Sequence, residues 1–80
     1  MIRYGINRNL SLSIKIRRGV SKSEMEELAF NIEGMVDDNQ KIPIRFQLED
    51  GLPMHWIKYI ERLCKNIPNT YSILREPSLA

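Results

Sequence analysis

Hydrophobic and polar residues alternate strictly in three stretches of the chain. The clearest alternation runs through residues 41–51, with Phe46 at its centre, and the others run through residues 2–7 and 10–17. Because the side chains of a strand point alternately to its two faces, each stretch predicts a strand with one buried and one solvated face. A last short strand is predicted over residues 70–75.

Elsewhere, apolar residues recur every three or four positions, which is typical of a helix with one buried side. The first stripe comprises Met25, Leu28, Ala29, Ile32 and Val36, and the second comprises Ile57, Ile60, Leu63, Cys64 and Ile67, with Trp56 beside it. Ser21 and Glu24 have the spacing of a capping box, and Val20 and Met25 that of a hydrophobic staple, so the first helix is predicted to begin there. Pro53 suits the first turn of the second helix.

The predicted order of elements is therefore β-β-α-β-α-β. Right-handed crossovers between parallel strands place both helices on the same face of the sheet. Each strand also has only one apolar face, so the other face is not covered. We expect an α/β fold on the border of α+β, a two-layer sandwich in which two helices back one face of a four-stranded mixed sheet. Residues 1–75 would form this single domain and residues 76–80 a flexible tail.

The size of the chain bears on its association. A domain of 80 residues buries only about 60% of its unfolded surface. A marginal core and exposed edge strands favour a protein partner, most simply a second copy in a twofold homodimer. The single cysteine excludes an intrachain disulfide and favours a reducing compartment. Since no stretch resembles a signal peptide or a membrane helix, we expect a cytoplasmic protein without membrane contact.

Charge suggests one candidate surface. Arg3, Lys15, Arg17 and Arg45 are predicted to share the outward face of the sheet, where Glu49 is the acidic residue beside them. Such cations could hold a phosphate backbone or an acidic protein, or they could simply keep the face solvated and protect the sheet edges. The predicted strands carry no aromatic residue on this face, and the net charge is only +2. We therefore expect weak, non-specific nucleic-acid binding at most.

Two further candidates lie at predicted strand ends. Arg17-Arg18-Gly19 leads into the capped helix, whose first amides favour an anion, although a cap flanked by exposed arginines explains the same residues. Glu49 and Asp50 could hold Mg²⁺, or they could form a turn and pair with the two arginines. The second alternative is favoured in both cases, so no metal or cofactor is expected.

Reactive side chains are few. Cys64 falls on the apolar stripe of the second helix, and His55 falls on the opposite side of the same helix. This spacing disfavours a Cys-His couple, and no other nucleophile and base are placed together. We expect neither enzymatic activity nor a small-molecule substrate.

Three apolar side chains lie outside the core stripes. Phe30 lies on the first helix and Met54 on the second, and Tyr59 lies on the flank of the second helix. Isolated exposed apolar groups are common. An aromatic residue and a methionine near each other would nevertheless suit a protein contact.

The element order, with a hairpin, a capped helix, a strand ending in Leu48-Glu49-Asp50, a helix and a strand, resembles the STAS domains of anti-sigma-factor antagonists. Residues 10–74 would cover the core of that fold, without the family's last helices. The resemblance implies a regulator that binds another protein. The family's regulatory serine follows this strand in an Asp-Ser-Ser-Gly-like run, whereas this chain continues with Gly51-Leu52-Pro53 and has no hydroxyl there.

Two functional hypotheses follow. The first is a small non-catalytic regulatory or adaptor domain that acts by protein–protein interaction. The alternative is a nucleic-acid-binding module that uses the basic open face of the sheet. Binding driven by phosphate contacts weakens steeply with salt, which separates the two.

Overall fold

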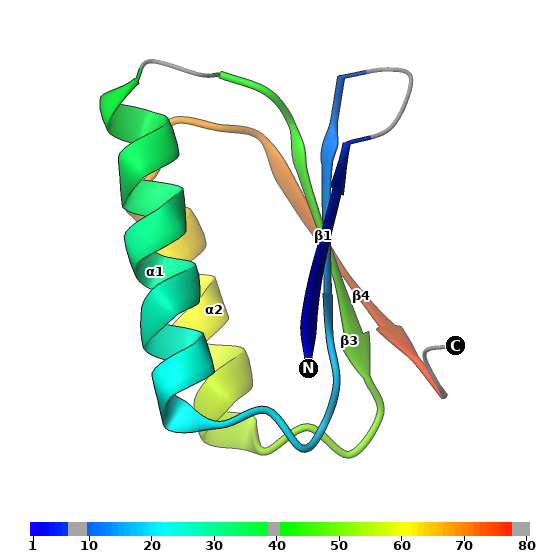
Figure 1. The fold of residues 1–80 in the computed structure, drawn as a ribbon. Coiled ribbons are helices and arrows are strands. Elements are labelled where there is room, and N and C mark those ends of the chain that lie inside the picture. Colours follow the sequence, from blue (N-terminus) through cyan, green and yellow to red (C-terminus); the bar gives the residue numbers. More distant parts are fainter. Residues whose placement is uncertain (7–9, 39–40, 78–80) are drawn as a thin grey trace.

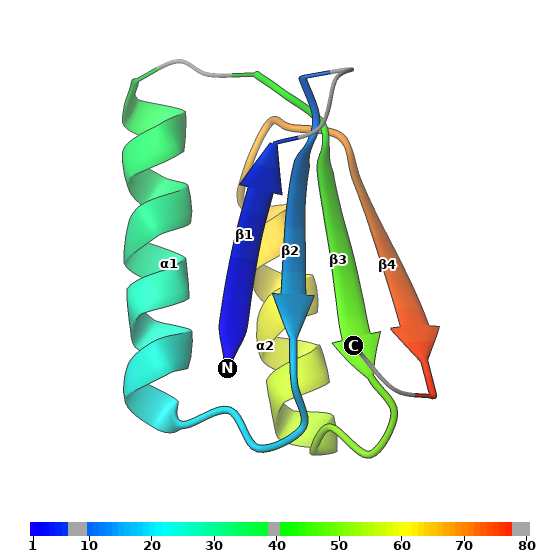
Figure 2. The same ribbon diagram turned by 45° about the vertical axis from the view of Figure 1, so that its right-hand side comes forward.

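A computed structural model describes residues 1–6, 10–38 and 41–77. These residues form, in chain order, β1 (Ile2–Ile6), β2 (Leu12–Ile16), α1 (Lys22–Asp37), β3 (Ile44–Glu49), α2 (Met54–Lys65) and β4 (Tyr71–Glu76). The strands form one four-stranded sheet in the order β1-β2-β3-β4. β1 is antiparallel to β2, whereas β2, β3 and β4 are parallel. Both helices lie against the same face (Figures 1 and 2), which confirms the predicted mixed sheet and element order.

The boundaries of three strands differ from the predicted ones, and each difference has a structural reason. Leu10 has a φ of 57°, outside the extended region, and β2 starts two residues later. Pro43 has no N–H to donate to a ladder, and β3 starts after it. At the end of β4, the carbonyl of Glu76 accepts a hydrogen bond from the N–H of Asp50 at 2.7 Å. Glu76 therefore belongs to β4 and not to the predicted tail. The rest of that tail, residues 78–80, and the predicted turn at residues 7–9 lie outside the described ranges.

The start of α1 confirms the predicted capping box. The Ser21 hydroxyl accepts a hydrogen bond from the N–H of Glu24 at 3.2 Å, and the Glu24 carboxylate accepts one from the N–H of Ser21 at 3.3 Å. The same carboxylate lies 2.7 Å from the amino group of Met1. Its hydrogen bond to that amino group, and then its bond to the Ser21 backbone, hold the pKa of Glu24 below its ordinary value. Glu24 thus joins the beginning of β1 to the beginning of α1.

This contact predicts an acid-sensitive contribution to stability. A carboxyl group whose pKa is lower in the folded chain stabilises the fold above its unfolded pKa, and the contribution disappears as pH falls through the folded pKa. We expect the melting temperature to fall less steeply between about pH 5 and pH 3 in Glu24→Gln than in the wild type. Glu33→Gln, on an exposed position of the same helix, should follow the wild-type curve. A Glu24→Gln curve parallel to the wild type would contradict the prediction.

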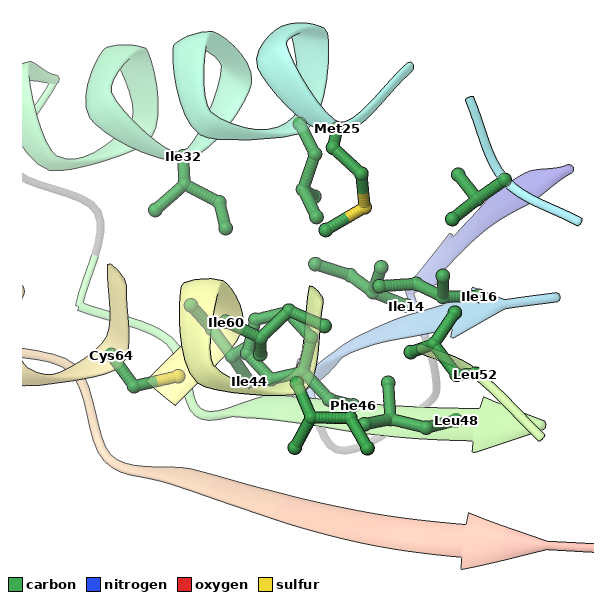
Figure 3. Packing of buried hydrophobic residues seen from close by; sticks show 13 residues of the cluster. Ile14, Ile16, Met25, Ile32, Ile44, Phe46, Leu48, Leu52, Ile60 and Cys64 are labelled. Carbon is green, nitrogen blue, oxygen red and sulfur yellow. The ribbon is translucent and has the colours of Figure 1, made fainter. Parts of the chain in front are cut away.

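The core lies between the sheet and the helices (Figure 3). It consists of Ile14, Ile16, Val20, Met25, Leu28, Ile32, Ile44, Phe46, Leu48, Leu52, Ile57, Ile60 and Cys64. Val20 and Met25, the predicted staple, are both buried in it. Of the predicted helical stripes, Ala29, Val36, Leu63 and Ile67 are only partly buried. Within the described ranges, neither helix has the length and apolarity needed to span a bilayer.

Candidate functional site

The face of the sheet that points away from the helices is termed the open face. Because Ile14 of β2 and Phe46 of β3 point into the core, the odd-numbered residues of β2 and β3 point outward. Strand register extends this assignment to β1 and β4 and arranges the outward residues in rows across the sheet. The two central rows are Arg3–Lys15–Gln47–Leu74 and Gly5–Ser13–Arg45–Ser72.

Three of the predicted cations are brought together on this face. Arg3 lies directly opposite Lys15 across the β1–β2 ladder, and Arg45 lies in the neighbouring row, opposite Ser13. All three cations are exposed. Like charges in directly opposed positions destabilise a sheet, so an anion near Arg3 and Lys15 would stabilise it. Arg17 follows the end of β2, and its N–H donates to the carbonyl of Met1 at 3.1 Å; its side chain is half-buried.

Small residues leave the surface around these cations hollow. A shallow cavity is lined by Arg3, Tyr4, Gly5, Ser13 and Lys15. A Cβ placed on Gly5 would meet no atom within 4 Å, so the space above it is open. An anionic group can therefore approach the two cations and the Ser13 hydroxyl at the same time.

The opposite corner of the open face is acidic. Glu49 at the end of β3 lies opposite Glu76 at the end of β4. The prediction that Glu49 is the acidic residue of this face was therefore incomplete, because the predicted last strand stopped at Arg75 and left out Glu76. The open face carries cations on β1, β2 and the first half of β3, and carboxylates where β3 and β4 end.

Arg18 is engaged within the protein. Its Nε lies 3.5 Å from Glu49 Oε1, and its backbone N–H donates to the same oxygen at 3.1 Å. Its side chain also covers the turn at Gly51, where a Cβ would come within 3.3 Å of Arg18 Cδ and where φ is 93°. The residues Arg17-Arg18-Gly19 form the turn before α1, in which the N–H of Val20 donates to the Arg17 carbonyl at 3.1 Å, and the helix cap itself is Ser21.

The remaining polar candidates, Cys64 and His55, lie in different surroundings on α2. Cys64 is buried, and burial, followed by the charge of Glu61, raises its pKa to about 11. Its thiol is therefore protonated at neutral pH. His55 is exposed on the other side of α2, and its ring centroid lies 4.6 Å from that of Trp56. Among the described residues, no three His, Cys, Asp or Glu side chains form a group that could hold a metal ion. Glu49 and Asp50 therefore have no third such side chain beside them.

The predicted apolar contact residues have separate surroundings. Phe30, in the middle of α1, is 75% exposed, and Met54, the first residue of α2, is 57% exposed. Both helices begin at the same end of the sheet (Figure 2), so Phe30 lies about 12 Å further along the helical layer at 1.5 Å per residue. Tyr59 is half-buried, with its ring edge-on to Trp56 at 5.6 Å.

Comparison with known proteins does not indicate a function. No family model, no curated protein and no solved structure matches the chain. The resemblance to STAS domains stays a prediction from the order of elements, and the open face is interpreted from its own charges and register.

Proposed function

We propose that the protein is a small non-catalytic regulatory or adaptor domain whose open face binds an acidic segment of a partner protein. The observation that supports this proposal is the grouping of Arg3, Lys15 and Arg45 on an uncovered sheet face, around the hollow left by Gly5 and Ser13. Guanidinium and ammonium groups form strong charge-assisted hydrogen bonds with carboxylates, and arginine does so with two parallel bonds. An Asp- or Glu-rich segment supplies such carboxylates.

The rest of the open face favours a peptide over a phosphate backbone. Gln47, in the centre of the face, is uncharged, so the row that it shares with Leu74 of β4 adds no further cation for a phosphate. Leu74, in the same row, is 46% exposed and offers an apolar contact. Glu76, which lies opposite Glu49 at the end of β4, would repel phosphate but would attract a basic residue of the partner.

The open face, as far as the structure describes it, carries no aromatic surface of the kind on which nucleic-acid bases usually stack. Binding of single strands relies on aromatic side chains on which bases stack. Register places Tyr4 opposite Ile14 and Tyr71 opposite Ile44, so both tyrosines belong to the helix-covered face. DNA or RNA would therefore bind only weakly, through charge alone.

Two further observations are consistent with a non-catalytic regulator. The protonated thiol of buried Cys64 and the exposed ring of His55, which is tilted against Trp56, do not form a pair of nucleophile and base. The order of elements also resembles that of the protein-binding STAS regulators, without the last helices of that family. Because the turn at Asp50-Gly51-Leu52-Pro53 has no hydroxyl, we propose that binding here is not switched by phosphorylation of that turn.

The proposal is tested by comparing three fluorescent probes in titrations at about 50 and 200 mM salt, a range over which phosphate contacts weaken strongly. The probes are an Asp- and Glu-rich peptide containing one lysine and one leucine, the same peptide with Gln and Asn in place of the acids, and single-stranded DNA. We expect the acidic peptide to bind best and the DNA signal to vanish at the higher salt. DNA binding that persists there would establish the nucleic-acid alternative, and equal binding of both peptides would refute recognition by charge.

A further inference from the structure

The outer edge of β4 presents a regular row of backbone hydrogen-bonding groups. The carbonyls of Thr70 and Glu76 accept hydrogen bonds from the N–H groups of Ile44 and Asp50, so both face β3. Backbone groups alternate in direction along a strand. Tyr71, Ile73 and Arg75 therefore direct their N–H and C=O groups to the edge, where β4 is the end strand of the described sheet. No lysine and no proline interrupts β4, although edge strands are commonly guarded in this way.

This edge is complementary to itself. In an antiparallel pair of two β4 strands centred on Ile73, Tyr71 lies opposite Arg75 of the second copy, and Ile73 lies opposite Ile73 of the second copy. These are the residues whose backbone groups face outward, so each pair can exchange two hydrogen bonds. A guanidinium facing a tyrosine ring is a favourable cation–π geometry. Ser72 then lies opposite Leu74 of the second copy, and no like charges are directly opposed.

We infer that two copies of the chain associate through their β4 edges in this register and form one continuous sheet around a twofold axis. This inference does not depend on the acidic partner of the open face. Antiparallel partners point to the same side of a sheet, so all helices lie on one side and both open faces on the other. The cations on β1 and β2 stand at the two outer ends of the assembly, each remote from the new seam.

β1, the strand at the other edge of the sheet, is less suited to pairing with a second copy. The carbonyl of Met1 accepts from the N–H of Arg17, so the outward backbone groups of β1 belong to Ile2, Tyr4 and Ile6. Pairing two β1 strands about Tyr4 would bring Arg3 and Lys15 of both copies together on one face. Charge repulsion disfavours that arrangement, and Gly5 in the middle of the strand weakens it further.

The mass of the full chain in solution provides the first test. A single strand from each copy makes a small interface, so we expect a dimer that dissociates at roughly micromolar concentrations. Arg75→Glu removes the contact with Tyr71 on both sides of the axis and should raise the dissociation constant roughly tenfold. Lys58→Glu, an equal charge change on the exposed surface of α2, should leave it unchanged. A monomer at roughly millimolar concentration, or equal effects of both variants, would overturn the inference.

Disulfide trapping tests the register. Ser72→Cys protein mixed with Leu74→Cys protein should give a cross-linked dimer under mild oxidation, because directly opposed residues without hydrogen bonds have Cα atoms about 4.5 Å apart. Each variant alone should cross-link poorly, because the two identical cysteines of such a dimer are then two residues away from directly opposed positions. Arg3→Cys mixed with Gly5→Cys is the matched pair for β1. Cross-linking of the β1 pair in place of the β4 pair would refute the assignment.

Discussion

Replacing Phe46 with alanine is expected to lower the free energy of unfolding by about 3–5 kcal/mol. The Phe46 side chain is fully buried in the middle of β3, and Figure 3 shows it near Ile44, Leu48 and Ile60. Its cluster includes buried residues of both helices, so truncation leaves a cavity between the sheet and the helices. A domain of this size has roughly 4–12 kcal/mol of stability. The variant should therefore be largely unfolded at moderate urea, as measured by the fluorescence of the single tryptophan, Trp56.

Phe30 provides the matched control, because it is the same residue type in an exposed position. Phe30→Ala should change the unfolding free energy by no more than about 0.5 kcal/mol. If both variants unfold at the wild-type urea concentration, β3 does not occupy the centre of the sheet. If both variants instead lost a large and equal amount of unfolding free energy, the exposed surface of α1 would be covered in solution.

Replacing Arg3, Lys15 and Arg45 together with glutamine is expected to weaken binding of the acidic peptide. Surface ion pairs contribute up to about 1 kcal/mol each, so the loss of three corresponds to an affinity decrease of up to roughly 150-fold. For DNA, the slope of log affinity against log salt should fall by about three, one for each phosphate contact. None of the three residues belongs to the buried core, so circular dichroism and the urea midpoint should stay close to the wild type.

A second triple variant separates the open face from the overall charge. Replacing Lys22, Lys58 and Arg62 with glutamine alters exposed positions on the helices. Both triple variants change the net charge from +2 to −1, since each removes three positive charges from a chain of net charge +2. The helical variant should keep most of its affinity for the peptide. A similar loss of peptide affinity in the two variants would show that the peptide responds to net charge. Unchanged affinity in both variants would exclude the open face as its binding surface.

Periodicity was sufficient to predict the fold because each element has its own clear pattern. The alternation around Phe46 and the capping box at Ser21 are local signals, and both agree with the packed structure. The ends of strands depend on features that alternation does not contain. The positive φ of Leu10 and the hydrogen bond between Asp50 of the β3 end and the Glu76 carbonyl are not visible in the alternation, and they account for the shifted boundaries.

The candidate site was predictable only in part. Alternation along single strands was enough to place Arg3, Lys15 and Arg45 on one face. Their mutual arrangement depends on register, which is a relation between strands and has no signature in either strand alone. For the same reason the sequence did not reveal the hollow at Gly5, the exposed row ending in Leu74, or the opposition of Glu49 and Glu76. The edge chemistry of β4 likewise depends on which neighbour the strand has.

The parallel arrangement of β2, β3 and β4 also constrains the order in which the sheet can assemble. Ile14 pairs with Phe46, 32 positions later, and Phe46 pairs with Ile73, 27 positions later. Each ladder must close a long loop before its hydrogen bonds compensate for the lost chain entropy. The β1–β2 hairpin and the capped start of α1 involve near neighbours and can form first. We expect the docking of β3 onto that hairpin to limit the rate of folding, so substitutions in β3 should slow folding more than those in β4.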